Sequence, residues 1–362
     1  MLPLLHSPPF DYTDCRYLQR AESIDIAKRG YDRAMTRLIH PESSLRMVLL
    51  CMAILLLSSC SQTNEIPTLK VGVIQWLGYE PLFLARSLQK YDPDMIKLVE
   101  LQSSTDTLRL LREGVIDAGA LTIDEVLGEL ALGTKLEIVL IIDISDGADT
   151  LLGKPGLNTL ADLKGKRIGV ESSAVGAVLL NGALVKAGLS AADITIVPLT
   201  ADTHLSAYMG GAVDALVTFK PTSSTLISRG AIKLFDSSEI PNQIIDVIAV
   251  RKDALQKTGS NIQLLIDGYF FALTYLHEHP EAATDLMAPR LGISGQDMLA
   301  SYEGLLLADR AKNSTLFSGT PSRLSMITTE LQTVLLRAKL LDHAVDSGTL
   351  FNAGFTAHRD ND

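Results

Sequence analysis

Two stretches of this chain repeat one pattern at the same separation, and this repeat constrains the fold more than any other feature. Gly72-Val73 matches Gly169-Val170, and segment 114–118 (GVIDA) matches segment 211–215 (GAVDA), each pair lying 97 residues apart. In each half a basic residue opens a short apolar strand, and the second motif ends a helix in Gly before a new strand. A repeat of this length is too long for a solenoid unit. It predicts two α/β lobes of similar plan.

The stretch 70–86 (KVGVIQWLGYEPLFLAR) predicts a strand, a loop and a helix in succession. Apolar alternation over 69–73 indicates a buried strand. Pro81 fits the first helical turn, because its missing N–H would have no partner there. A loop entering a helix N-terminus offers free N–H groups to a small polar ligand. Trp76, the only tryptophan, and Tyr79 lie in this loop, where they either pack under the helix or face a ligand.

Composition narrows the class of protein further. The net charge of −10 argues against nucleic acid as a partner, because phosphate neutralisation needs a basic surface. Apolar residues make up 47% of the chain and aromatic residues only 5%, so the core must be mostly aliphatic. Such a core suits α/β layers.

The front of the chain predicts a targeting segment. Residues 1–46 show no sustained periodicity and are interpreted as a leader or an unused upstream extension, with Met35 or Met47 as the alternative start. Segment 47–57 (MVLLCMAILLL) is shorter than the roughly 20 residues that span a bilayer and has the length of a signal-peptide core. The following string, Leu57 to Cys60 (LSSC), resembles the bacterial lipobox, which implies a lipid on Cys60. A plain signal peptide that happens to contain a cysteine is the alternative.

The three cysteines agree with this interpretation. Cys15 and Cys51 fall in the removed segments and Cys60 would carry the anchor, so no disulfide is expected in the mature domain. The mature chain would then be an acidic domain on a lipid tether, outside the cytoplasm.

Beyond the leader, the chain alternates strands and helices. Expected strands are 69–74, 97–101, 117–121, 137–142, 167–170, 194–199, 215–218, 233–235 and 244–250, and the chain from 261 to its end is expected to be helical. Segment 143–149 (DISDGAD) has the composition of a solvated crossover loop. It falls where the first lobe should lead into the second, so we assign it to both the cleft rim and the first crossing, and segment 236–241 to the second crossing. Asp246 lies inside an apolar strand and needs a partner if buried.

Three histidines invite functional interpretations that we do not favour. His277 and His279 are two residues apart, so their imidazoles would point apart on a helix, and a surface helix end is expected. His204, at a helix start, is expected at the surface.

The motifs together resemble the substrate-binding proteins of nitrate/sulfonate/taurine-type ABC importers, a group that also contains binding proteins for thiamine pyrimidine precursors. The matching strings are WLGYEPLFLAR at 76–86, SDGAD at 145–149, ADLKGKRIGVE at 161–171, GAVDA at 211–215, DSSEIP at 236–241 and IIDV at 244–247. The resemblance covers residues 67 to about 340. One departure is Phe219-Lys220-Pro221, where the family often has W-E-P. A lysine there would change the charge preference for the ligand if it faced the cleft.

The resemblance implies a periplasmic-binding-protein type II fold, with two α/β lobes, two crossings and a ligand cleft between the lobes. The expected division is a leader at 1–46, a signal-peptide core with lipobox at 47–59, the first part of lobe 1 at 60–147, lobe 2 at 148–240, and the lobe 1 return with C-terminal helices at 241–362.

Site residues also come from the resemblance, position by position. Aromatic residues would form a flat wall, hydroxyl groups would donate hydrogen bonds, and Asp146 would pair with an amine or amidine-like group. The expected ligand-binding residues are Gln75, Trp76, Gly78, Tyr79, Ser103, Ser104, Thr122, Asp146, Ser172, Ser173, Ala174, Thr218 and Asp246.

The expected function is an extracytoplasmic solute-binding lipoprotein that delivers its ligand to a membrane permease powered by a separate ATPase. The chain has no P-loop, so energy must come from these partners. No cofactor, metal or catalytic residue is expected, and we expect a monomer in the periplasm or cell envelope. The alternative is an enzyme of the same fold, either thiamine-pyrimidine synthase-like or a small-molecule lyase. Two ligand classes stay open: an aminopyrimidine or similar heterocycle, which we prefer, and a sulfonate-like anion.

Overall fold

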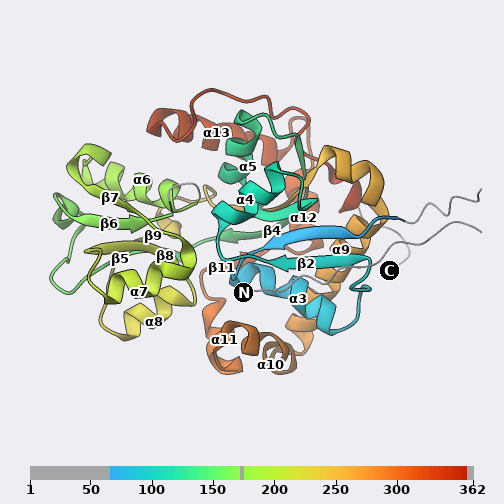
Figure 1. Ribbon diagram of the computed structural model, residues 1–362, viewed down its shortest axis with the longest axis horizontal. Helices are drawn as coiled ribbons and strands as arrows, with labels where there is room; N and C mark the ends of the chain where they lie inside the picture. Colours follow the sequence, from blue (N-terminus) through green and yellow to red (C-terminus); the bar gives the residue numbers. More distant parts are fainter. Residues whose placement is uncertain (1–65, 172–174, 357–362) are drawn as a thin grey trace, which may run out of the picture. The chain divides into compact units, whose positions relative to one another are not determined.

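The computed structural model describes residues 66–356 apart from 172–174, and its strands form two mixed sheets (Figure 1). The first sheet has the order β11-β4-β10-β3-β1-β2, with β1 Leu69–Val73, β2 Ile96–Glu100, β3 Ala118–Thr122, β4 Leu136–Ser145, β10 Ile245–Arg251 and β11 Leu305–Leu307. The second has the order β7-β6-β8-β5-β9, with β5 Asp149–Gly153, β6 Arg167–Val170, β7 Thr195–Pro198, β8 Ala215–Phe219 and β9 Ile232–Asp236. We call each sheet with its helices a lobe.

Each sheet contains three adjacent strands that run parallel and one strand that pairs with this group in the antiparallel direction. In the first, β1 is parallel to β2 and β3, while β10 runs antiparallel to β3 and β4. In the second, β6 is parallel to β7 and β8, while β5 runs antiparallel to β8 and β9. The predicted pair of α/β lobes is therefore confirmed.

The sequence repeat has a physical cause that is the same in each lobe. The Asp117 carboxylate accepts a hydrogen bond from the backbone N–H of Lys70 at 2.8 Å, and Asp214 accepts one from Arg167 at 2.9 Å. Each contact fixes the start of the lobe's first parallel strand. A Cβ atom on Gly72 would lie 2.5 Å from the end of the Ile116 side chain, so any larger residue there would have to displace Ile116.

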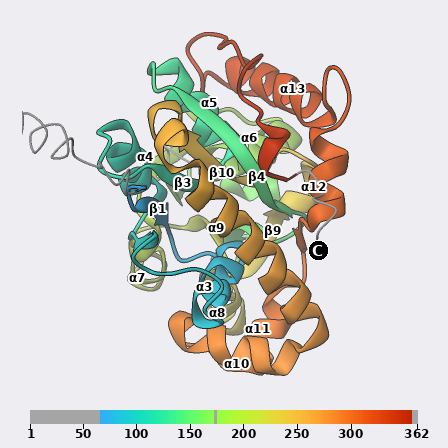
Figure 2. The same cartoon turned by 90° about the vertical axis from the view of Figure 1, so that its right-hand side faces the viewer.

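Helices cover both faces of each sheet (Figures 1 and 2). One face of the first sheet carries α3 Glu80–Ser87, α9 Lys252–Glu278, α10 Pro280–Leu291 and α11 Gly295–Ser301; the other carries α4 Ser104–Arg112, α5 Ile123–Ala131, α12 Arg310–Phe317 and α13 Arg323–Ala338. The second sheet carries α6 Val175–Ala187 on one face, with α7 His204–Met209 and α8 Thr222–Ser228 on the other.

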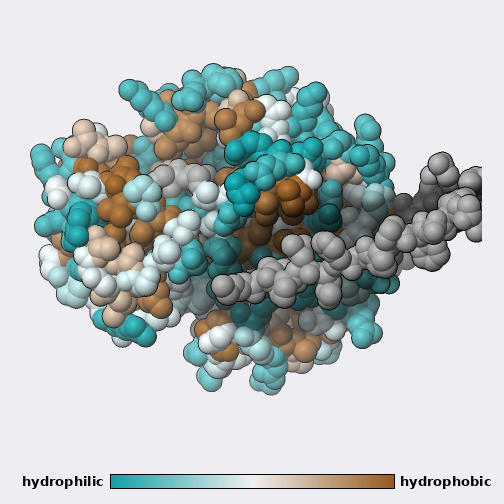
Figure 3. Space-filling model, viewed as in Figure 1, coloured by the Kyte–Doolittle hydropathy of each residue, from teal (hydrophilic) through white to brown (hydrophobic). Residues whose placement is uncertain are grey.

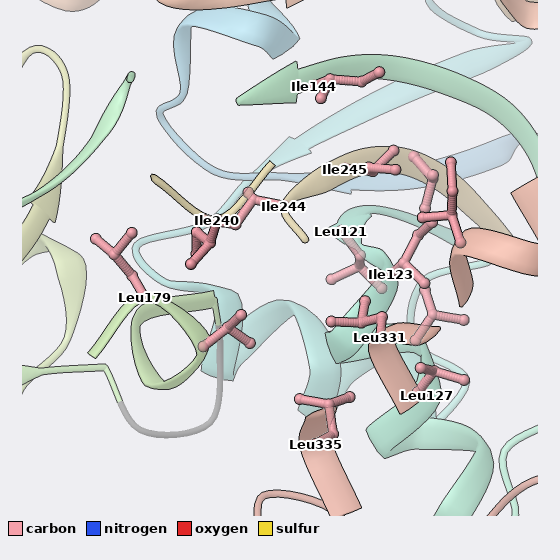
Figure 4. Packing of buried hydrophobic residues seen from close by; sticks show 14 of the residues in the cluster. Leu121, Ile123, Leu127, Ile144, Leu179, Ile240, Ile244, Ile245, Leu331 and Leu335 are labelled. Atoms are coloured by element: carbon pink, nitrogen blue, oxygen red, sulfur yellow. The ribbon is translucent and has the colours of Figure 1, made fainter. Parts of the chain in front are cut away.

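One apolar core runs from one lobe into the other (Figure 4). Leu179 of α6 lies beside Ile240 and Ile244 of the second crossing, and the same cluster continues to Ile245 of β10 and Leu331 of α13. Its members are almost all aliphatic, with Phe235 and Phe317 as the aromatic exceptions, and all are at least nine-tenths buried. The crossing segments are therefore part of the core.

The visible surface is mostly polar, with separate apolar areas (Figure 3). The exposed large apolar side chains come from different elements, such as Leu132 after α5 and Val185 in α6. Of the residues that the structure describes, none form a helix long and apolar enough to cross a membrane. The leader and Cys60 lie outside the described residues.

The structure corrects three sequence expectations. Strand β4 continues to Ser145 and β5 begins at Asp149, so the first crossing is much shorter than the expected loop at 143–149. Helix α9 begins at Lys252 rather than near 261, and the short strand β11 interrupts the region expected to be wholly helical. For β4, β5 and β11, pairing with neighbouring strands decides segments whose own residues favour another conformation.

Candidate ligand-binding pocket

A pocket lies between the lobes, where parallel strands from both sheets end. The space between its side chains amounts to about 530 Å³ when the solvent at its open side is included. The first lobe contributes Ile74, Trp76, Tyr79, Ser104, Thr122, Glu125, Ile244 and Asp246, and the second contributes Asp149, Glu171, Val175, Gly176, His204, Val217, Thr218 and Phe219.

The loop after β1 places two aromatic side chains in this pocket. A 3-10 turn at Leu77–Tyr79 leads directly into α3, with Pro81 in the first helical turn as the sequence predicts. The Trp76 ring meets the Phe219 ring edge to face, with centroids 5.4 Å apart. One aromatic residue from each lobe therefore closes the pocket on this side.

Two carboxyl groups lie beneath the aromatic residues and hold them. Trp76 donates its indole N–H to Asp143 at 3.1 Å, and the Tyr79 hydroxyl donates to Asp246. Asp143 and Asp246 are direct neighbours on β4 and β10. Burial raises the pKa of Asp143 to about 7 and raises the pKa of Asp246 well above its ordinary value. The partner that Asp246 was predicted to need is Tyr79.

Three more buried carboxyl groups line the pocket itself. Burial raises the pKa of Asp149 to about 6 and that of Glu125 to about 8, and it also raises the pKa of Glu171. Among the lining residues that the structure describes, none is Lys or Arg. At pH 7 these pKa values leave Asp149 ionised and Glu125 protonated, and no cationic side chain of the described lining offsets the charge of Asp149.

His204 is buried in the pocket, contrary to the expectation of a surface histidine. Its Nδ1 lies 3.2 Å from the Thr218 hydroxyl, and its ring packs near Phe219. Burial lowers its pKa to about 4, so the imidazole is neutral at pH 7. A helix of six residues places this side chain inward because it packs against the end of β8.

Two polar contacts bridge the lobes at the edges of the pocket. Glu171 accepts hydrogen bonds from the backbone N–H and the hydroxyl of Thr105, at 3.1 and 2.7 Å. The Lys220 ammonium donates to the carbonyls of Ser301 and Glu303, at 3.1 and 2.7 Å. Lys220, the residue that departs from the family pattern, thus contacts the other lobe and is not among the lining residues.

The structure brings six of the sequence-predicted site residues together around the pocket, and these are Trp76, Tyr79, Ser104, Thr122, Thr218 and Asp246. Four others lie elsewhere. Gln75 is exposed and donates to the Arg290 carbonyl; Gly78 packs against Asp143; Ser103 caps α4; and Asp146 is exposed. Ser172, Ser173 and Ala174 lie outside the described residues.

Sequence reasoning missed the most acidic part of the lining. Glu125 and Asp149 each lie close in sequence to a predicted residue, but a carboxylate near a loop is usually solvated, and only the tertiary structure shows their burial. Glu171 ends a motif that we matched, so its position at a strand end was a usable signal. His277 and His279 are exposed at the end of α9, as predicted. Across the described ranges, no cluster of three or more His, Cys, Asp or Glu residues is arranged to hold a metal ion.

Comparisons with known proteins agree on the fold. A family model described as NMT1/THI5 like matches residues 95–283, more than half of the chain. A protein of Escherichia coli (strain K12), provisionally named an aliphatic sulfonates-binding protein, is 26% identical over 236 residues, which cover 62% of this chain and 74% of that protein.

Two solved structures have the same fold. The alkanesulfonate-binding protein of Xanthomonas axonopodis pv. citri, bound to MOPS, superposes with a TM-score of 0.68 at 22% identity, covering 79% of this chain and 98% of that one. The desulfurization enzyme DSZB superposes with a TM-score of 0.55 at 19% identity, covering 80% and 97%. The expected periplasmic-binding-protein type II fold is confirmed.

Proposed function

Since this chain belongs to the NMT1/THI5-like family, we propose that it is the solute-binding component of an ABC importer. It captures a small organic solute in the pocket between its lobes and delivers it to a membrane permease that a separate ATPase drives. The sequence features of residues 47–60 support a lipid anchor on Cys60 and a place in the cell envelope.

The observation that carries this proposal is a pocket between the lobes to which both lobes contribute functional side chains. Its lining comes from strand ends and helix starts of two sheets, and aromatic residues from each lobe meet across it. A ligand held there contacts both lobes at once, so binding favours the conformation in which they are close together. A receptor that signals occupancy to a permease needs this property.

The ligand that we propose is a nitrogen heterocycle or related organic base rather than a sulfonate. The relatives in Escherichia coli and Xanthomonas are named for sulfonates. A sulfonate is held best by cationic donors, whereas the described lining of this pocket has carboxyl groups, aromatic rings and three Ser and Thr hydroxyl groups but no Lys or Arg. The sulfonate-binding relatives therefore support the fold of this chain, but they do not indicate the charge of its ligand.

The alternative of an enzyme rests on the fold that this chain shares with DSZB. Binding is supported better, because the relatives found by sequence are named as binding proteins. The same samples test both functions, since turnover would change the solute and binding would not.

Fluorescence of the single tryptophan tests the proposed function. The purified protein is titrated with aminopyrimidines, amidines, thiamine, taurine, alkanesulfonates and nitrate, and the solutions are then analysed by mass spectrometry. We expect one class to change the emission of Trp76 and to raise the Tm, with the solute recovered intact. A solute at 100 times its Kd adds about 2.7 kcal/mol to the free energy of unfolding. Conversion of any solute would support the enzyme instead.

A further inference from the structure

We infer that this pocket selects a small organic cation with a flat, donor-rich head, of the amidinium or guanidinium class. The inference deepens the proposed function and rests on it, because it names the substrate class of the same pocket.

Unpaired polar atoms inside the pocket carry the first step. Oε1 of Glu125, Oδ2 of Asp149 and Nε2 of His204 are buried and have no hydrogen-bond partner in the described part of the chain. All three residues line the pocket and are less than a tenth exposed. Buried polar atoms are usually paired, so these three indicate a ligand that completes their hydrogen bonds.

The charge of the pocket carries the second step. The lining carboxyl groups of Glu125, Asp149, Glu171 and Asp246 come from α5, β5, the loop after β6 and β10, and so from both lobes. An ionised carboxylate only accepts hydrogen bonds, and the pKa of about 6 leaves Asp149 ionised at pH 7.5. A cationic donor bound there would also favour ionisation of the other lining carboxyl groups, whose pKa burial raises. A cation donates its hydrogen bonds with charge assistance, whereas a sulfonate would place a second negative charge beside Asp149.

The aromatic side of the pocket carries the third step. Trp76 and Phe219 present apolar ring surface next to the acidic lining. A planar amidinium or guanidinium group pairs with carboxylates through parallel N–H bonds and also packs against aromatic rings. A compact ammonium uses only part of this arrangement, which is why we favour the planar cations.

Three probes of similar shape and different charge test the inference by titration calorimetry at pH 7.5. These probes are benzamidine, which is cationic, benzamide, which is neutral, and benzenesulfonate, which is anionic. We expect benzamidine to bind at least about tenfold more tightly than benzamide, because charge-assisted hydrogen bonds are stronger than neutral ones. Benzenesulfonate should bind more weakly than either.

Two isosteric variants locate the effect. Asp149→Asn should weaken benzamidine binding about tenfold to a hundredfold and change benzamide binding by less than about threefold, because only the cation uses the charge. Asp146→Asn is the matched control, since Asp146 lies three residues away in sequence but is exposed and outside the lining. It should leave the Kd for benzamidine unchanged. The Tm of each unliganded variant confirms that it folds.

The outcomes separate the inference from the proposed function. If benzenesulfonate binds more tightly than benzamidine, the inference is overturned while the chain remains a solute-binding protein. Equal loss of benzamidine affinity in Asp146→Asn and Asp149→Asn also overturns it, because the charge effect would then not come from the pocket. If no probe binds and the wider solute panel gives no Trp76 response, both the inference and the proposed function are wrong.

Discussion

At the scale of single residues, the pocket holds carboxyl groups in surroundings that disfavour their charge. Asp149 is almost fully buried, and none of the described lining residues is a cation that could offset it. Ionisation of such a group costs free energy in the folded state, so the folded protein carries a cost at neutral pH. A ligand that supplies positive charge removes that cost. Binding strength and folding stability are therefore opposed at this residue.

The stability of Asp149→Asn relative to wild type, measured at different pH values, gives the free-energy cost of ionising Asp149. The pKa of Asp149 rises from 3.8 to about 6 in the folded state, so its contribution to stability is lost as the pH rises from about 4 to about 6. The asparagine at position 149 of the variant cannot ionise, so the variant's free energy of unfolding does not fall for this reason over this pH range. We expect it to be more stable than wild type by up to roughly 3 kcal/mol at pH 7.5, with no difference near pH 4, in denaturant unfolding of the unliganded protein.

The control for this prediction is again Asp146→Asn, which removes an exposed carboxylate. Its stability should follow that of wild type at both pH values. If Asp149→Asn were less stable than wild type by the same amount at both pH values, the side chain would be fixed by neutral hydrogen bonds, and its charge would not be the destabilising factor.

At the scale of elements, the turn after β1 packs closely against strand β4 because residue 78 of the turn is glycine. A Cβ atom on Gly78 would lie 1.7 Å from Oδ2 of Asp143, the oxygen that also accepts from Trp76. The glycine thus allows the Leu77–Tyr79 turn to reach β4 and to place Trp76 in the pocket. Its role is to position the loop.

We predict that Gly78→Ala destabilises the protein by about 1–3 kcal/mol, because Asp143 must move away from the new methyl group. Gly128→Ala in α5 is the matched control. A Cβ atom there meets no other atom within 4 Å, so alanine should stabilise the helix by about 0.5–1 kcal/mol. Urea unfolding followed by circular dichroism measures both. Equal effects of the two substitutions would contradict the packing explanation.

Local patterns were enough to predict most strands and the loop that holds Trp76. Alternating apolar residues, Pro81 and the glycines at helix ends are local signals, and the structure follows them. Asp143 and Asp149 were misjudged because a carboxylate-rich segment favours a solvated loop. Asp143 instead lies in β4, where it pairs with Asp246 of β10 and Leu307 of β11, and the distant Trp76 donates to its buried carboxyl group. Pairings of this kind cannot be predicted from the local pattern.

At the scale of the whole molecule, the lobes are held together by two crossings and by contacts across the pocket. The crossings are bonded to each other, since the Ser145 and Ser237 hydroxyls lie 2.7 Å apart and Gly147 donates its N–H to Ser237. This link joins the two segments about which the lobes can rotate. Lys220 and Glu171 then hold the lobes together away from the crossings. We expect these outer contacts to set how often the pocket opens.

Removal of Lys220 tests that expectation. Its ammonium donates two hydrogen bonds to backbone carbonyls of the other lobe, and charged hydrogen bonds of this kind contribute about 1.5–3 kcal/mol each. Loss of even one would change the ratio of closed to open molecules about tenfold. We therefore expect Lys220→Ala to increase the radius of gyration of the unliganded protein in small-angle X-ray scattering. A ligand that binds both lobes should restore the wild-type value.

Lys164→Ala is the control, because the Lys164 ammonium pairs with Asp193, on its own lobe, at 3.7 Å. It should leave the radius of gyration unchanged. Identical scattering from Lys220→Ala and wild type would mean that Lys220 only fastens the segment 301–303. The lobes would then be held by Glu171 and by the apolar core that runs through the second crossing, and opening would have to disrupt that core. The scattering data therefore distinguish lobes held by a polar contact at the rim from lobes held by their shared core.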